Sequence, residues 1–184
     1  MKILLITDKE AFAKNSPLSL VKINEFLDKE LEVVEVNGEN IFPCIGCYQC
    51  WIKTPGICFQ NDEINTLLAK VINCDLLIIV SKITYGGYSY DIKSFFDRTI
   101  PLISPSFKKI NKEMHHDKRY KNFPNLINLA YGECSDEEKE TFTTLIKRNV
   151  INYHIKKFLT LFTYNKLEFK EALNKITTFI SEEL

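Results

Sequence analysis

Asp75-Leu-Leu-Ile-Ile-Val80 is the stretch of sequence that decides the fold class. Its five consecutive aliphatic residues form a short, continuous apolar run, which is typical of a β-strand buried on both faces of a sheet. Lys2–Thr7, near the start of the chain, has the same character. Three further runs are interpreted as strands: Leu31–Val36, Leu126–Tyr131 and Lys157–Tyr164. The sequence therefore predicts five strands.

Helical patterns fill the segments between these strands. Ser135-Asp-Glu-Glu138 is a capping box that begins one helix, and Ser16 is expected to cap the first helix of the chain. The other helices are expected to begin near Asp62, Ser89 and Leu167. Asp97 and Arg98 are expected to pair at a helix end, and Ser104–Tyr120 is expected to be an irregular insertion. Alternating strands and helices predict an α/β fold with an open parallel sheet covered on both faces.

The composition limits the classes of protein to consider. A chain of 184 residues, 45% of them hydrophobic, suits one domain over residues 1–184. Its 24 basic and 24 acidic residues balance, whereas nucleic-acid binders normally carry a basic excess, so no nucleic-acid partner is expected. Met1–Thr7 runs directly into charged residues without a cleavage-site pattern, and no apolar run is long enough to span a membrane. We expect a cytoplasmic protein with reduced thiols.

The loops after the first, third and fourth strands meet at one edge of such a sheet, where ligands bind in open α/β folds. The first loop offers polar groups near a helix start, from Thr7, Asn15, Ser16 and Ser19. They can bind an anion or simply cap the helix. This loop has no glycine, so it matches neither the Rossmann fingerprint nor the Walker loop. In Ser81-Lys-Ile-Thr-Tyr-Gly-Gly-Tyr-Ser89, the adjacent glycines allow close approach of a ligand, although a plain turn also fits.

Four cysteines form the most distinctive motif of the chain. Cys44, Cys47, Cys50 and Cys58 follow the spacing C-x2-C-x2-C-x7-C. In a reducing compartment, such short spacings favour metal, cluster or redox chemistry over structural disulfides. The four thiolates suit a [4Fe–4S] cluster or a tetrahedral zinc ion, and free thiols or a reversible disulfide are the remaining interpretation. Because the motif follows the second strand, we expect it at the same edge of the sheet as the loops.

Three segments resemble the flavodoxin-like NAD(P)H-dependent oxidoreductases, a group that includes FMN reductases and iron–sulfur flavoproteins. The first is Pro43-Cys-Ile-Gly-Cys-Tyr-Gln-Cys50, continuing through Pro55-Gly-Ile-Cys58 to Asp62. The second is Ser81–Ser89, continuing through Lys93-Ser-Phe-Phe-Asp-Arg98, and the third is the weaker Ala130-Tyr-Gly-Glu133. Together with the order of strands and helices, the resemblance covers nearly the whole chain.

This resemblance implies a flavodoxin-like three-layer sandwich with a five-stranded parallel sheet in the order 2-1-3-4-5. It also implies a homodimer that binds FMN, with NAD(P)H as co-substrate and a small electron acceptor such as a flavin or a quinone. The flavin would carry the hydride chemistry, without an obligatory acid or base from the protein. Trp51 would cover the flavin edge or contact the partner. The implied FMN-binding residues are Thr7, Asn15, Ser16, Ser19, Ser81, Ile83, Thr84, Tyr85, Gly86, Tyr131, Gly132 and Glu133.

Two alternatives stay open beside this interpretation. The first is an iron–sulfur flavoprotein that carries electrons through a [4Fe–4S] cluster on Cys44, Cys47, Cys50 and Cys58. The second is a non-enzymatic binding protein that has lost FMN. It is motivated by the first loop, where the resembling proteins usually have a Gly-Ser-Pro-Arg-like sequence and this chain has Asp8 and Glu10. Acidic side chains disfavour a bound phosphate through like-charge repulsion.

Overall fold

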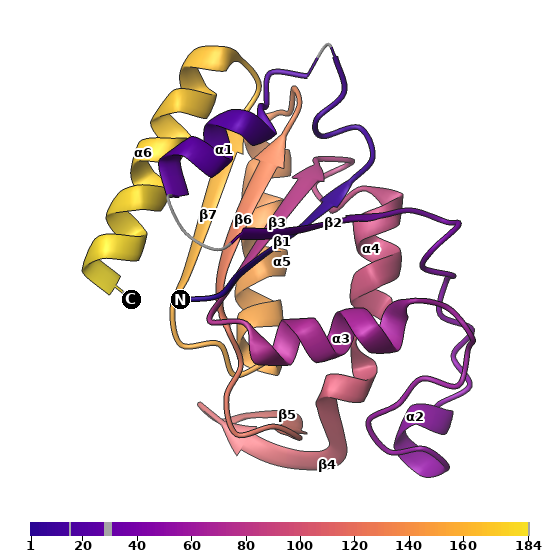
Figure 1. Ribbon diagram of the computed structural model, residues 1–184. Coiled ribbons are helices and arrows are strands. Elements are labelled where there is room, and N and C mark those ends of the chain that lie inside the picture. The colour runs from indigo at the N-terminus through magenta and orange to yellow at the C-terminus, as the bar shows by residue number, and fades with distance from the viewer. Residues whose placement is uncertain (15, 28–30, 184) are drawn as a thin grey trace.

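The computed structural model describes residues 1–14, 16–27 and 31–183, and Figure 1 shows its elements. The central sheet is parallel throughout and has the order β2-β1-β3-β6-β7. Numbered by chain order among these five strands, this is the predicted order 2-1-3-4-5, so the predicted flavodoxin-like fold is confirmed. The strands are β1 (Ile3–Asp8), β2 (Leu31–Val36), β3 (Leu76–Lys82), β6 (Asn125–Tyr131) and β7 (Phe158–Thr163).

Helices cover both faces of the sheet and complete the three layers (Figure 1). Successive strand residues point to opposite faces. In β1, Ile3 and Leu5 belong to one apolar core, whereas Leu4 and Ile6 belong to the other. This is why the β1 sequence is continuously apolar instead of alternating. The first core is covered by α1 (Leu20–Leu27) and α6 (Lys166–Glu183), and the second by α3 (Ile64–Asn73), α4 (Tyr90–Asp97) and α5 (Asp136–Asn152).

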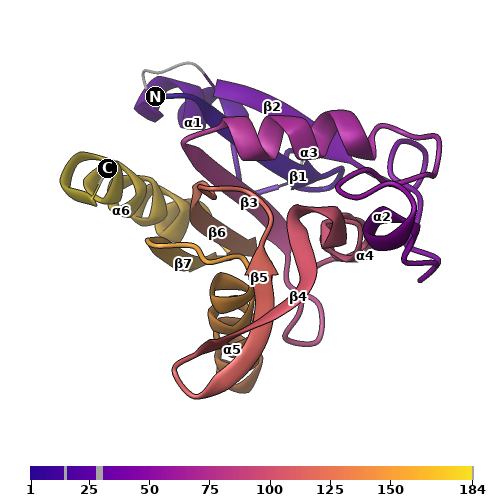
Figure 2. The ribbon, with the colours of Figure 1, turned by 90° about the horizontal axis from the view of Figure 1, so that it is seen from below.

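Ser104–Tyr120 is not irregular, and that prediction is wrong. The segment forms an antiparallel hairpin of β4 (Ile103–Ile110) and β5 (Glu113–Lys118), which is separate from the central sheet and lies beside α5 (Figure 2). Its turn residues Asn111 and Lys112 have φ values of +49° and +71°. Two positive φ values are typical of a type I′ hairpin turn, which usually contains glycine. Because this turn lacks glycine, the sequence contains no hairpin signal.

The helix starts agree with the sequence only in part. The capping box is confirmed, because Ser135 Oγ accepts the Glu138 N–H at 3.2 Å and Glu138 Oε2 accepts the Ser135 N–H at 2.9 Å. The predicted cap at Ser16 is wrong, since α1 begins at Leu20. Ser16 instead closes a turn ahead of the helix, where its Oγ accepts the Leu18 N–H at 3.1 Å. The remaining short helices are α2 (Gln49–Ile52) and the 3-10 helix η1 (Ile100–Leu102).

Candidate functional site

A cavity of about 500 Å³ lies where β1 and β3 end and α4 begins. This is the carboxyl edge of the sheet, beside the β1–β3 pair where the strand order reverses, and it is where open α/β sheets bind their ligands. Its lining comes from the loops after β1 and β3, the first turn of α4 and the first turn of α5. The lining residues are Asp8, Glu10, Lys82, Ile83, Thr84, Tyr85, Ser89, Tyr90, Asp91 and Glu138.

Asp8 ties three strands together at the base of this cavity. Its Oδ2 accepts the Lys82 N–H at 2.8 Å, and its Oδ1 accepts the Tyr131 hydroxyl at 2.6 Å. Only 3% of Asp8 is exposed. Burial raises the pKa of Tyr131, and the hydrogen bond to Asp8 and the negative charge of Asp8 raise it further. The phenol is therefore a fixed donor to a carboxylate, and Asp8 is a structural part of the sheet edge.

The loop after β3 ends in a tight two-residue turn. Thr84 and Gly87 exchange two backbone hydrogen bonds of 3.0 and 2.9 Å around Tyr85 and Gly86. Both turn residues have positive φ values, +50° and +72°. A Cβ added to Gly86 would lie 2.8 Å from the Cβ of Thr141 on α5, so this glycine allows the turn to pack on α5. The Tyr85 side chain is 93% exposed at the mouth of the cavity.

The cavity carries an excess of negative charge. Asp8, Glu10, Asp91 and Glu138 line it, against Lys82 alone among the described lining residues. The Lys82 ammonium already pairs with Glu10, at 2.9 Å. Burial raises the pKa of Asp91, and the negative charges of Asp8, Glu10 and Glu35 raise it further, while Lys9 acts in the opposite direction. The potential inside this cavity is therefore negative.

The predicted FMN-binding residues fall into four groups. Ile83, Thr84 and Tyr85 line the cavity. Other predicted residues are structural in this arrangement: the Thr7 hydroxyl donates to the Asp8 carbonyl at 3.1 Å and the Ser81 hydroxyl to the Lys82 carbonyl at 3.0 Å. Asn15 lies outside the described residues. The rest are not among the described lining residues of the cavity, namely Ser16, Ser19, Gly86, Tyr131, Gly132 and Glu133.

Several lining residues were missed by sequence reasoning. Tyr90 and Asp91 form the first turn of α4, and Glu138 forms part of the first turn of α5. A usable signal was present, because both helices follow strands whose carboxyl ends face the cavity. The first turns of these helices therefore reach the same edge as the loops.

The lining fits one part of FMN and not another. Ile83, Thr84 and the Tyr85 ring offer apolar and polar contacts for an isoalloxazine, and the volume is of the size found for small-molecule sites. The phosphate is different, since the carboxylates at Asp8, Glu10 and Asp91 repel a dianion. The residues present suit a flavin ring and do not suit the phosphate of FMN.

The cysteines do not join this cavity, whose described lining contains none of them. Cys44 and Cys47 are exposed, Cys58 is partly exposed and Cys50 is buried. Burial raises the pKa of Cys50, and the neighbouring cysteines raise it further. Within residues 1–14, 16–27 and 31–183, no three His, Cys, Asp or Glu side chains converge on a point where they could hold a metal ion. The arrangement therefore does not support the four-thiolate cluster that the sequence leaves open as one alternative.

Trp51 anchors the cysteine segment away from the cavity. Its Nε1–H is shared between the carbonyls of Ile100 and Ile103, at 3.0 and 3.1 Å. Its ring centroid lies 4.8 Å from that of His116 on β5. The segment thus packs on η1 and the hairpin, and Trp51 does not line the cavity at the carboxyl edge.

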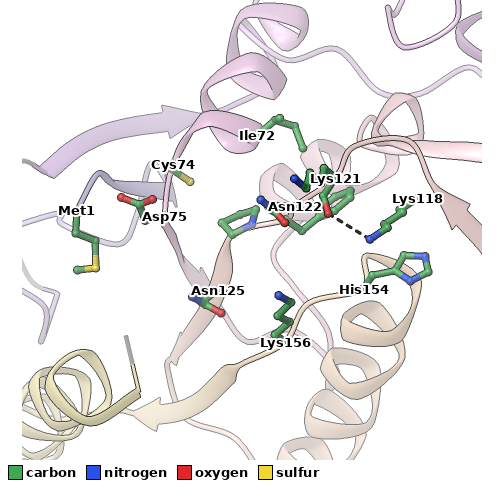
Figure 3. Close-up of a pocket in the computed structure, with 12 residues that line it drawn as sticks. Met1, Ile72, Cys74, Asp75, Lys118, Lys121, Asn122, Asn125, His154 and Lys156 are labelled. Atoms are coloured by element: carbon green, nitrogen blue, oxygen red, sulfur yellow. Dashed lines mark hydrogen bonds between the residues drawn. The ribbon is translucent and has the colours of Figure 1, made fainter.

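A second cavity of about 470 Å³ lies at the opposite, amino edge of the sheet (Figure 3). Asp75 and Asn125 line it at the starts of β3 and β6. Its lining carries an excess of positive charge, from Lys118, Lys121 and Lys156 against Asp75. The Lys118 ammonium donates to the Lys121 carbonyl at 3.2 Å. The two edges of the sheet therefore have cavities of opposite charge.

Comparison with known proteins places the chain among flavin-dependent proteins. A family model described as NADPH-dependent FMN reductase matches residues 1–119, more than half of the chain. An iron–sulfur flavoprotein of Methanocaldococcus jannaschii is 34% identical over 73 residues, which are 40% of this chain and 37% of that protein. The matched regions cover 32 to 42% of the length of the three curated relatives, all iron–sulfur flavoproteins.

Solved structures share the fold at low sequence identity. An FMN-dependent NADH-azoreductase of Bacillus anthracis in complex with FMN has a TM-score of 0.60 and 10% identity, with 98% of each chain covered. An NADH:FMN oxidoreductase in its apo form has a TM-score of 0.58 and 12% identity, covering 100% of this chain and 90% of that chain. At such identities the likeness concerns the fold alone.

Proposed function

Because this chain belongs to the NADPH-dependent FMN reductase family, we propose that it is a flavin-dependent oxidoreductase that takes electrons from NAD(P)H and passes them to a small acceptor. The observation that carries the proposal is the family match together with a cavity at the carboxyl edge of the sheet. A bound flavin would supply the hydride and electron chemistry. The protein would supply position and electrostatics.

In this proposal the flavin ring lies against the loop after β3, at Ile83, Thr84 and Tyr85. Ser81 holds this loop, since its Oγ accepts the Ser89 N–H at 2.9 Å and so fixes the start of α4. Tyr131, Gly132 and Glu133 support the site from the end of β6. The acceptor is a free flavin, a quinone or, by analogy with the azoreductases of this fold, an azo compound.

The test is anaerobic oxidation of NADH or NADPH by the purified chain, followed at 340 nm, with riboflavin, FMN, a quinone or an azo dye as acceptor. Tyr85→Ala should lower the rate, because Tyr85 is exposed and its loss removes a ring contact without disturbing the core. Tyr164→Ala, another exposed tyrosine, is the matched control. If neither NADH nor NADPH is oxidised in a flavin-dependent reaction, the alternative of a non-enzymatic binding protein is favoured.

An iron–sulfur flavoprotein is the second candidate, because all three curated relatives bear that name. Anaerobic purification with iron and sulfide analysis tests it. About four irons per chain, lost on Cys50→Ser, would support a cluster on the four cysteines. No iron after chemical reconstitution would exclude it. No step of the main proposal passes through a cluster.

Homodimer formation and a cytoplasmic location stay predictions. None of the helices in the described part of the chain combines the length and apolar character needed to traverse a bilayer. Light scattering after gel filtration measures the mass in solution directly, and a mass of one chain would contradict the dimer.

A further inference from the structure

Several hydrogen-bond donors at the end of β1 and in the loop after it bond within this segment. The Thr7 hydroxyl donates to the Asp8 carbonyl at 3.1 Å, and the Ser16 hydroxyl donates to the Ala11 carbonyl. Backbone N–H groups within the loop are also used internally, from Ala11 to the Asp8 carbonyl and from Ala13 to the Glu10 carbonyl, at 3.3 and 3.2 Å. In this conformation these two hydroxyls and two N–H groups are not free to donate to a phosphate.

The carboxylates of Asp8, Glu10 and Asp91 line the cavity beside this loop. The Asp8 carboxylate is buried and bonded to β3 and β6, so it cannot turn away from an incoming anion. Glu10 and Asp91 stand in the same cavity, and the nearby cation Lys82 is already paired with Glu10. Lys9 offsets part of this charge, since it lowers the pKa of Asp91.

The carboxylates of this cavity favour a ligand group that donates hydrogen bonds, such as a hydroxyl, over a phosphate. An ionised carboxylate only accepts hydrogen bonds, whereas a sugar-alcohol hydroxyl can donate them. The ribityl chain of a flavin carries such hydroxyls, so Glu10 and Asp91 can accept hydrogen bonds from it. A phosphate carries about −1.5 to −2 charge at neutral pH and offers mainly acceptors, and it therefore gains nothing from these side chains.

We propose that the cavity at the carboxyl edge selects flavins that lack a terminal phosphate, so that riboflavin binds more tightly than FMN, with Asp8, Glu10 and Asp91 as the residues that set this preference. The inference rests on the proposed function, because it concerns the flavin of that same site. It names the flavin class that the chain takes, as cofactor or as substrate.

The test is a calorimetric titration of the full chain with riboflavin and with FMN at low and at high salt. Riboflavin should bind about tenfold more tightly than FMN at low salt, the ratio expected from one unfavourable charge contact in a partly solvated site. Added salt should raise the FMN affinity and leave riboflavin unchanged, because salt screens the repulsion. Attraction of the phosphate to the lysine cavity at the amino edge would give the opposite salt dependence (Figure 3).

A double variant, Glu10→Gln with Asp91→Asn, tests the assignment to residues. It keeps the shape of both side chains and one acceptor oxygen on each, so riboflavin binding should persist and report that the chain is folded. The FMN affinity should rise to within about twofold of riboflavin. Glu171→Gln, an exposed glutamate on α6, is the control and should leave the ratio unchanged.

The outcomes separate the two proposals. FMN affinity equal to or above that of riboflavin, or FMN affinity that falls with added salt, would overturn the selection and leave the proposed function standing. An unchanged ratio in the double variant would overturn the role of Glu10 and Asp91. Binding of neither flavin would overturn the proposed function itself, and the selection with it.

Discussion

Arg98 and Asp62 form a buried, two-pronged ion pair at the base of the cysteine segment. Both nitrogen–oxygen distances are 2.9 Å, and the two side chains are only 1% and 2% exposed. Asp62 also accepts the Phe42 N–H at 2.8 Å, and Arg98 donates to the Phe42 carbonyl at 2.5 Å. The pair therefore joins both ends of the segment to the end of α4.

Breaking this pair should destabilise the protein strongly. Arg98→Met would leave the Asp62 carboxylate buried without its counter-ion, and we expect a loss of about 3–5 kcal/mol in the free energy of unfolding, measured in urea. Lys93→Met is the control, because it removes an exposed pair with Asp97 and should cost about 0–1 kcal/mol. Losses of similar size in the two variants would contradict this prediction.

The same pair should make stability depend on acid. Burial would raise the pKa of Asp62, but hydrogen bonds from Arg98, Phe42 and Ile64 and the Arg98 charge outweigh it, so the pKa lies below its usual range. Its contribution is therefore complete above the unfolded-state value of about 4 and is lost as the pH falls through the folded-state value. Urea unfolding below about pH 5 measures this. Asp62→Asn should flatten the profile, whereas an unchanged slope would refute the assignment.

Gly86→Ala should be costly although a methyl group is small. The substitution combines a φ of +72° with a Cβ 2.8 Å from Thr141, and we expect a loss of about 1–3 kcal/mol. Gly38→Ala is a matched control, since nothing lies within 4 Å of its added Cβ. That change should be neutral or stabilise the chain by up to about 1 kcal/mol. Thermal unfolding compares the two, and equal melting temperatures would show that the Gly86 turn is not constrained by α5.

The six cysteines should react at very different rates. Cys44 and Cys47 are exposed and should be alkylated first by iodoacetamide. Burial raises the pKa of Cys74 to about 12, so it should stay almost entirely a thiol at pH 8. Cys50 should also react slowly, because it is buried and its pKa is raised. Mass spectrometry of peptides at timed intervals gives the order, and early labelling of Cys74 would contradict it.

Sequence reasoning predicts the central sheet well, because β1 and β3 are buried on both faces and their apolar runs carry that information. It fails where the structure depends on distant partners or on unusual turns. The sequence predicts that Arg98 pairs with its neighbour Asp97, yet Arg98 pairs with Asp62, and Asp97 pairs with Lys93. The β4–β5 hairpin was missed because Asn111 and Lys112 make its turn without glycine.

For the candidate site, too, the sequence predicts the location but not the contacts of individual side chains. Its place at the carboxyl edge follows from topology, so the loop containing Ile83, Thr84 and Tyr85 could be identified from the sequence. The hydrogen bonds that individual side chains make could not be predicted from the sequence. Ser16 has its hydroxyl committed to the Ala11 carbonyl, and Asp8 is locked between two strands, which only the three-dimensional contacts reveal.

The contact between Phe42 and Asp62 has a consequence for how this family can vary. The cysteine segment begins and ends at one point, so its interior can change length without moving the strands on either side. Each doubling of such a loop costs only about 0.6 kcal/mol in closure entropy. The length of the stretch between these two residues can therefore change at little cost to the stability of the central sheet. A change in the length of this segment should therefore leave the carboxyl-edge cavity intact, because none of the described residues that line the cavity belongs to the segment.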